Sequence, residues 1–330
     1  MYDVITIGSN TVDLFVHTDQ SGMIDFHSRR GVEQFISYPV GTKMLITRLL
    51  HNFGGNGTNS AVAFSRLGLK TGYVGEIGRD DNGTRIISNL KNEKIDFLGG
   101  RSCESGFSII LDAFEEDRTI LVYKGCNNDL KLKEIKKANL KSKWVYLSSM
   151  LGESLKTMQQ IAEYAKKSKI KIAFNPSITI LENEAEKAIN IIRCSDLLVL
   201  NKEEAEYVVG NSQNSPEMNI KELLAFGPKI IAITDGKNGA LAYNDGYYYK
   251  IMPRSDLKIV ETTGAGDAFA STLTAGIILG KPFEFCLKMA INNSEAVITH
   301  HGAQNLLLLR KKLFEIVGKD KRKIERIKAQ

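Results

Sequence analysis

Continuous apolar runs of strand length alternate with helical stretches along most of the chain, and this alternation restricts the fold more than any other feature. The runs lie at 4–8, 71–75, 144–147, 170–174, 197–200 and 230–234. Helical periodicity lies between them, for example at 85–94, 154–167 and 184–193, and the chain from 265 onward reads as successive helices. Uninterrupted apolar runs are typical of strands buried on both faces of a parallel sheet. We therefore expect a three-layer α/β domain with a central, mostly parallel sheet.

Two regions break this alternation. Residues 12–51 contain short β-like runs at 14–16 and 44–47 and no helical pattern. Residues 105–124 resemble a hairpin with arms at 107–111 and 118–123, and with Glu115, Glu116 and Asp117 at its turn. Neither region has enough apolar surface for its own core. We predict a main domain formed by 1–11, 52–104 and 125–330, with 12–51 and 105–124 forming a small β-sheet against one edge of it.

The composition indicates an ordinary globular protein. The chain has 330 residues, 43% of them hydrophobic and 25% charged, which is enough for one large core with a small appendage. The net charge is +6, and the tail 319–330 holds six Lys or Arg against two Asp or Glu, so +4 of the excess lies there. The body therefore lacks the footprint of a nucleic-acid-binding protein. We expect the tail to be a solvated helix end.

The cysteines and the apolar segments bear on the compartment. Cys103, Cys126, Cys194 and Cys286 are far apart and lack metal-site spacing. The sequence shows no signal peptide and no apolar stretch long enough to span a bilayer. We expect a cytoplasmic protein with reduced cysteines and no membrane partner. The histidines form no ligand cluster, so no protein-held metal site is expected from them.

The segment 261–269 carries the strongest chemical signal. Gly264, Ala265 and Gly266 form a tight turn directly before an apolar run of helical spacing. The first N–H groups of a helix lack internal partners and carry partial positive charge, so a phosphate can approach them where side chains are small. Asp267 follows in the first helical turn, where it could accept a hydroxyl proton. A capped helix behind a glycine turn is the alternative interpretation.

A second glycine-rich turn leads into a helix at 54–68. Gly55 opens it, and Asn56 and Asn59 place amides in and just after the turn. Amides both donate and accept hydrogen bonds, so they suit the hydroxyls of a polyol. The alternative is that these asparagines only satisfy backbone groups at the helix start.

Together the two segments resemble the paired signatures of the ribokinase, or PfkB, family of carbohydrate kinases. Further stretches follow the order of that family across residues 2–317. They are 7–9 with Asp13, 74–80, Asn201 to Glu204, Thr234 to Gly236, and 302–304. Two long motifs in the right order are specific. The resemblance implies a ribokinase-like fold in which the small β-sheet is a lid over the sugar, and in several members also a dimer interface.

The resemblance also implies an activity and a set of roles. The activity is transfer of the γ-phosphoryl group of ATP to a hydroxyl of a sugar or sugar-like molecule. Asp267 would be the catalytic base, and the N–H groups of Gly264, Ala265 and Gly266 the anion hole. The acceptor would be held by Asp13, Gly55, Asn56 and Asn59, and the nucleotide by Asn201, Thr234 and Gly236. Glu204 would organise Mg²⁺, mainly through water, although Asn201 and Glu204 could also form a capping box.

The chain departs from the family pattern at several points. Glu261 stands where Asp is usual, at the position where many members bind K⁺, so we expect weak K⁺ activation or none. The segment 20–50 is longer than in the common family pattern, and Ile291 stands where a polar residue often lies near the adenine. Two other functions remain open. A nucleoside kinase would need an apolar face such as Phe15, Phe35 and Tyr38, and a non-catalytic sugar or nucleotide sensor would not need Asp267.

Overall fold

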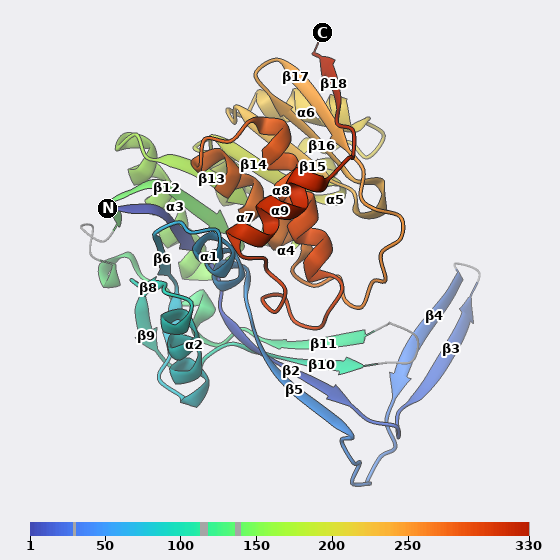
Figure 1. Ribbon diagram of the computed structural model, residues 1–330. Helices are drawn as coiled ribbons and strands as arrows, with labels where there is room; N and C mark the ends of the chain where they lie inside the picture. Colours follow the sequence, from blue (N-terminus) through green and yellow to red (C-terminus); the bar gives the residue numbers. More distant parts are fainter. Residues whose placement is uncertain (29–30, 113–117, 136–139, 330) are drawn as a thin grey trace.

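A ten-stranded sheet forms the middle layer of the computed structural model, which describes residues 1–28, 31–112, 118–135 and 140–329 (Figure 1). The seven neighbouring strands β8, β6, β1, β12, β13, β14 and β15 are parallel, and β16, β17 and β18 continue the sheet antiparallel. In spatial order they are β18 (Glu325–Lys328), β17 (Tyr247–Ile251), β16 (Ala240–Asn244), β15 (Ile230–Thr234), β14 (Leu197–Asn201), β13 (Lys171–Asn175), β12 (Ser142–Ser148), β1 (Tyr2–Ile7), β6 (Thr71–Val74) and β8 (Asp96–Phe97). The predicted parallel sheet is confirmed.

Helices cover both faces of this sheet. One core contains residues of α3 (Gly152–Lys167), α4 (Ile178–Ile192), α5 (Lys202–Val209) and α6 (Pro216–Leu224). The other contains residues of α1 (Asn56–Arg66), α7 (Ala265–Ile278), α8 (Phe283–Val297) and α9 (Arg310–Lys319). Within β13, Ile172 and Phe174 enter the first core and Ala173 the second. Both faces of the strand are buried, which is why the sequence shows an uninterrupted apolar run.

Short elements complete the main body. Helix α2 (Asp81–Asn92) begins at Asp80, whose side chain accepts the Gly83 N–H. Strands β7 (Glu76–Gly78) and β9 (Gly100–Ser102) pair beside it. The 3-10 helices are η2 (Gly125–Asn128), η3 (Leu132–Glu134) and η5 (Gly236–Asn238).

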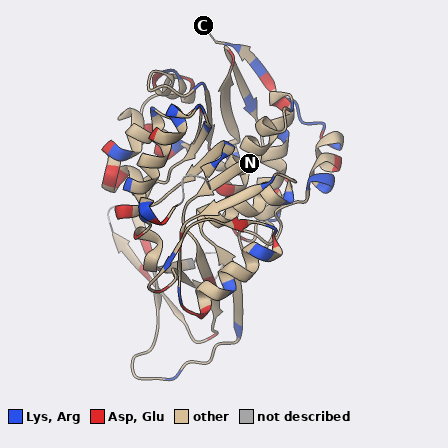
Figure 2. Ribbon diagram, turned by 90° about the vertical axis from the view of Figure 1, so that its left-hand side faces the viewer, with Lys and Arg blue, Asp and Glu red and all other residues tan. Residues whose placement is uncertain are grey.

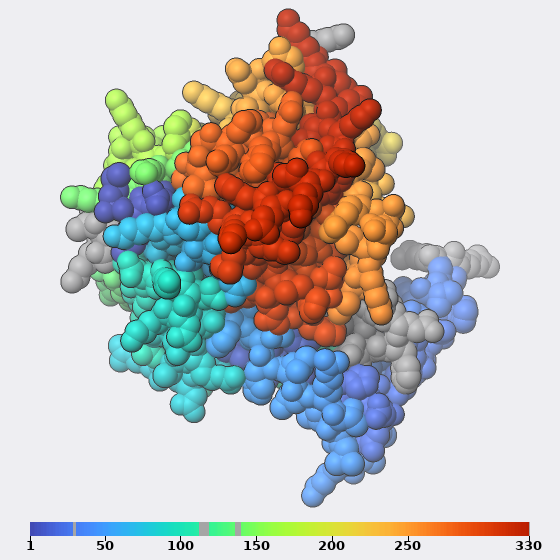
Figure 3. All heavy atoms as spheres, viewed as in Figure 1, coloured from blue at the N-terminus to red at the C-terminus, as the bar shows by residue number. Residues whose placement is uncertain are grey.

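A second sheet projects from the body (Figures 1 and 3). Its strands are, in order, β11 (Arg118–Tyr123), β10 (Phe107–Asp112), β2 (Thr11–His17) and β5 (Arg48–Gly54). A further hairpin, β3 (Gly22–Ser28) with β4 (Gly31–Ser37), extends beyond it. We call this sheet and the hairpin together the lid. The predicted arms 107–111 and 118–123 are confirmed, while the predicted turn at 115–117 lies outside the described residues.

Two local expectations were wrong. Residues 44–47 are not a strand, because the pairing with β2 begins only at Arg48. The tail is not a helix end either: α9 stops at Lys319, and β18 pairs antiparallel with β17. The Arg326 guanidinium lies 3.8 Å from the centre of the Tyr247 ring. This cation–π contact and the backbone pairing hold the basic tail as an edge strand.

The surface charges are mixed in sign, and the helices are those of a protein without an evident membrane span in its described part. Lys and Arg are interspersed with Asp and Glu over the helices on the face shown in Figure 2. Within the described ranges, no helix combines the length and the apolar character that crossing a bilayer requires.

Candidate active site

A cavity of about 370 Å³ lies between the carboxyl ends of the parallel strands and the lid. This is the edge at which open α/β sheets usually bind ligands. The cavity brings together most of the residues predicted for the site, although they come from widely separated parts of the chain. They are Asp13, Gly55, Asn56, Asn59, Asn201, Glu204, Thr234, Gly264, Gly266 and Asp267. Ala265 and Gly236 belong to the same turns but do not line it.

The turn before α7 needs its first glycine. Gly264 is the N-cap and has the left-handed conformation, with φ 82°. A Cβ there would lie 2.4 Å from that of Ala303. The Ala265 N–H is directed to the Thr262 carbonyl at 3.2 Å. Among the described residues, no carbonyl accepts the Gly266 N–H, and Gly266 faces the cavity. Of these two N–H groups, that of Gly266 is therefore the one available to a ligand in the cavity.

Asp267 lies at the cavity wall in the first turn of α7. Burial raises the pKa of its carboxyl to about 6, against the lowering effects of Asn59 and Asn56. Asn59 Nδ2 donates to Asp267 Oδ2 at 2.9 Å. A carboxyl with this pKa is ionised near neutral pH and is more basic than an ordinary aspartate, which suits a general base.

A chain of side-chain amides fixes the orientation of Asn59. Gln304 Nε2 donates to Asn59 Oδ1 at 3.0 Å, so the Asn59 amino group points to Asp267. Asn89 Nδ2 in turn donates to Gln304 Oε1 at 3.1 Å. Both Asn59 and Gln304 are almost fully buried. Asn59 was predicted to hold the acceptor, and in the structure its side chain contacts Asp267 directly.

The turn before α1 supplies the amides that lie next to Asp267 at the cavity wall. Gly55 is its N-cap with φ 94°, and a Cβ there would lie 2.5 Å from Asn10 Cα. The N–H groups of Gly57 and Thr58 are both directed to the Ser9 carbonyl, at 3.1 and 3.3 Å. These two N–H groups are satisfied within the protein, so the side chains of this turn are better placed than they are to meet a ligand.

Asp13 enters the cavity from the lid. It lies on β2 and is 9% exposed. Thr11 Oγ1 donates to Asp13 Oδ1 at 3.0 Å. Burial raises the pKa of its carboxyl, while hydrogen bonds from Ser108 and Thr11 lower it. A buried carboxylate held by hydroxyls is suited to accept hydrogen bonds from a polyol.

Asn201 and Glu204 form the capping box that was considered as the alternative for them, and they also lie at the cavity. They form a capping box at α5, with Asn201 Oδ1 accepting the Glu204 N–H and Glu204 Oε2 accepting the Asn201 N–H, each at 2.8 Å. Both also line the cavity. Burial raises the Glu204 pKa to about 7, with smaller raising effects from Glu203 and Asp267. A nearby cation would be needed to keep this carboxylate charged at neutral pH.

Some residues of the cavity were not predicted from the sequence. Ser108, Lys124 and Asn175 line it as well, together with Ser9 from the stretch 7–9 noted in the sequence. Ser9 Oγ lies 3.3 Å from Asn56 Oδ1, and Ser108 stands opposite Asp13 in the pairing of β10 with β2. Lys124 follows β11 directly, and its signal in the sequence was only a lysine at the end of a predicted strand.

Glu261 turns its carboxylate toward the segment after α8. It is 3% exposed, and its Oε2 accepts the Gly302 N–H at 2.9 Å. His301 Nδ1 lies 3.7 Å from the same oxygen. Glu261 thereby links the segment around Ala303 to the turn before α7.

A helix start with an open N–H group lies beside a carboxylate that an amide contacts directly, at the wall of a cavity in an α/β sheet. This is the arrangement that phosphoryl transfer to a hydroxyl requires. The family model for pfkB carbohydrate kinases matches residues 30–309. The chain therefore belongs to the pfkB family of carbohydrate kinases. The enzyme class predicted from the sequence, a phosphotransferase with an alcohol group as acceptor, is confirmed.

Similar proteins cover nearly the whole chain. Ribokinase of Bacillus subtilis is 29% identical over 96% of this chain and 100% of that protein. A 5-dehydro-2-deoxygluconokinase of Clostridium botulinum is 29% identical over 87% of this chain and 89% of that protein. The fold matches a Methanocaldococcus jannaschii nucleoside kinase with a TM-score of 0.78, at 19% identity, over 96% of this chain and 99% of the other.

Proposed function

We propose that the protein transfers the γ-phosphoryl group of ATP to a hydroxyl of a sugar or sugar-derived molecule. One observation carries the proposal: Asp267, with a raised pKa, lies beside the open Gly266 N–H at the wall of a polar cavity. The carboxylate accepts the proton of the attacking hydroxyl, and the turn from Gly264 to Gly266 stabilises negative charge on the transferred group. The solved ribokinase of Arabidopsis thaliana, complexed with ribose and ATP, shares this fold with a TM-score of 0.76 at 18% identity.

The acceptor side of the cavity favours a sugar over a nucleoside. Asp13, Asn56 and the Gly55 turn surround it with hydrogen-bonding groups. Of the aromatic residues considered for a nucleobase, Phe35 and Tyr38 do not line the cavity and are exposed. Asn59 would orient the Asp267 carboxylate through its hydrogen bond and would also border the acceptor. The relatives include both ribokinase and 5-dehydro-2-deoxygluconokinase, so the family resemblance alone leaves the sugar open.

The nucleotide side lies at the ends of β14 and β15. Asn201 and Thr234 would contact the phosphates, and Gly236, with φ 47° and open space where a Cβ would lie, would flank the nucleotide. Within the described part of the chain, no three His, Cys, Asp or Glu gather as a metal site. Glu204 fits an Mg²⁺ ion held mainly by phosphates and water, because its buried carboxylate has a pKa of about 7 and lacks a cationic partner among these residues. The metal would neutralise charge on the phosphates.

The lid would cover the acceptor, with 12–51 and 105–124 as its segments and the rest of the chain as the main domain. We also propose a homodimer through the lid, because Ile24, Phe26, Phe35 and Leu121 are exposed on it. Sedimentation equilibrium of the wild type and of Phe26→Ser tests this. A monomer at micromolar wild-type concentration contradicts the dimer.

The activity is tested by ADP release with a panel of sugars, sugar acids, sugar phosphates and nucleosides. We expect turnover with at least one sugar-type acceptor in Mg²⁺, and loss of turnover in Asp267→Asn. Asp256→Asn, the same change at an exposed loop position, is the control. A preference for nucleosides would establish the nucleoside kinase instead. Sugar or nucleotide binding without any turnover would establish the sensor.

A further inference from the structure

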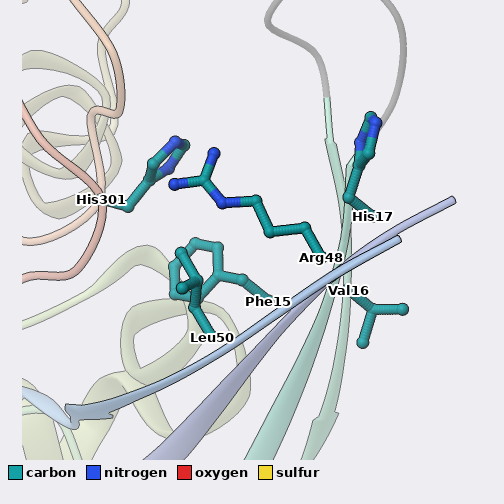
Figure 4. A pocket seen from close by; sticks show the side chains of 6 residues that line it. All are labelled: Phe15, Val16, His17, Arg48, Leu50 and His301. Atoms are coloured by element: carbon teal, nitrogen blue, oxygen red, sulfur yellow. The ribbon is translucent and has the colours of Figure 1, made fainter. Parts of the chain in front are cut away.

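A second, smaller pocket lies between the lid and the main domain (Figure 4). Phe15, Leu50 and Arg48 reach it from the lid strands β2 and β5, and His301 reaches it from the segment after α8. The rings of Phe15 and His301 meet edge to face, with centroids 5.7 Å apart. Two groups that can bind an anion thus stand over an apolar floor.

This pocket lies next to the acceptor region both on the lid and on the main domain. On the lid, Phe15 follows Asp13 by two residues, so both side chains are on one face of β2 about 7 Å apart along the strand. On the main domain, His301 is two residues from Ala303, whose Cβ packs against Gly264 of the α7 turn. A six-carbon acceptor whose reacting hydroxyl meets Asp267 would therefore extend toward Phe15 and Arg48.

The Arg48 side chain lines this pocket. Within the ranges that the structure describes, its guanidinium has no hydrogen bond and no ion pair, and Figure 4 shows it pointing from β5 toward His301. His17, which also lines the pocket, lies 3.3 Å from Asp19 and is already paired. Glu261 is buried, and its Oε2 lies 3.7 Å from His301 Nδ1. That arrangement leaves the Nε2 edge of His301 for another partner.

We propose that Arg48 and His301 bind an anionic group at the end of the acceptor remote from the phosphorylated hydroxyl. This inference rests on the sugar kinase function proposed above and narrows its substrate class to sugar acids or sugar phosphates. The planar guanidinium presents paired donors that match a carboxylate or phosphate, and His301 adds a third donor at Nε2 when its ring is protonated. The carbon chain of the acceptor covers Phe15 and Leu50.

Matched acceptors test the proposal in the wild-type enzyme. ADP release is measured with glucose, gluconate and glucose 6-phosphate, with ribose, ribonate and ribose 5-phosphate, and with fructose and fructose 6-phosphate. We expect the best anionic acceptor to exceed its neutral partner in kcat/KM, with an advantage that falls as KCl rises. The acid and the phosphate of each set distinguish the two sources of the anion. If no acceptor is phosphorylated, the proposed function itself has failed.

Arg48→Met removes the charge and keeps most of the stem. We expect kcat/KM for the best anionic acceptor to fall by roughly 10- to 100-fold through KM, with kcat and the KM for ATP little changed. Arg48→Lys should recover part of the loss. Lys43→Met, at an exposed lid position outside the pocket, is the matched control. Preference for a neutral sugar in the wild type, or an equal loss for neutral and anionic acceptors in Arg48→Met, overturns the proposal.

Discussion

The starts of α1 and α7 are two versions of one backbone device. Each begins at a glycine with positive φ, 94° at Gly55 and 82° at Gly264. At α1 the N–H groups of Gly57 and Thr58 are directed to the Ser9 carbonyl. At α7 no carbonyl of the described residues takes the Gly266 N–H, and an acidic residue follows. A glycine turn before a helix is therefore an anion site only where the fold leaves its N–H groups open.

The largest expected effect on kcat comes from the acidic residue in the first turn of α7, Asp267, which has no counterpart at the start of α1. Asp267→Asn keeps the size of the side chain and removes the base, so kcat should fall by roughly 10²- to 10⁴-fold. Binding of ATP, measured by calorimetry, should stay within the range of the wild type. The wild-type kcat should fall as the pH drops below about 6, the pKa to which burial raises Asp267. A variant that keeps more than a tenth of the wild-type kcat removes Asp267 from the role of base.

Glycine-to-alanine substitutions test which glycines the two turns need for stability. Gly264→Ala places a Cβ 2.4 Å from that of Ala303 in a left-handed conformation, and Gly55→Ala places one 2.5 Å from Asn10 Cα. Each should lower the free energy of unfolding by about 1–3 kcal/mol. Gly266→Ala is the matched control for stability, because a Cβ there meets nothing within 4 Å. Denaturant unfolding measures all three, and equal losses contradict the assigned strain.

The amide chain gives a smaller effect with a distinctive signature. Gln304→Ala removes the donor that holds Asn59 Oδ1, so the Asn59 amino group is less firmly directed to Asp267. Because that hydrogen bond lowers the Asp267 pKa, its weakening should raise the pKa and move the acid limb of the kcat profile to higher pH. We expect kcat at neutral pH to fall by about 3- to 10-fold. Asn89→Ala, one step further out, should shift the limb less.

The acid limb separates this role from a general loss of packing. If Gln304→Ala lowers the melting temperature and leaves the limb where it is, Gln304 is only structural. The amide chain then has no part in tuning the base.

The sequence predicted the main sheet because its strands are buried on both faces. The runs at 170–174 and 197–200 correspond to β13 and β14, whose apolar side chains enter the cores on both faces of the sheet. The helical pattern at 184–193 lies between them. The hairpin β3–β4 was missed because Ile24, Phe26 and Phe35 are apolar yet exposed, so no inside and outside alternate. Its apolar residues follow no buried face of this chain.

The site could be predicted only where a local motif marked it. The two glycine turns are contiguous in sequence, so their roles could be inferred from them. Asn59 and Asp267 are 208 residues apart, and no local pattern in the sequence shows that the Asn59 amide donates to the Asp267 carboxylate. Gln304 is 245 residues from Asn59. Contacts of this range are set by the packing of α1 against α7, which only the folded structure displays.

The smallest expected effect concerns monovalent cations. Glu261 is buried, and its carboxylate accepts the Gly302 N–H at 2.9 Å with His301 Nδ1 at 3.7 Å. A K⁺ ion beside the α7 turn would have to bind a carboxylate whose Oε2 is already held by these contacts. We therefore expect kcat in Tris buffer to change little when KCl replaces NaCl at matched ionic strength. Glu261→Asp shortens the side chain by one methylene and withdraws it from Gly302, so activation by K⁺ should appear only in that variant. Strong activation of the wild type by K⁺ over Na⁺ would show that Glu261 still serves an ion. Loss of activity in Glu261→Asp without rescue by K⁺ would show instead that its contact with Gly302 is what holds the α7 turn in place.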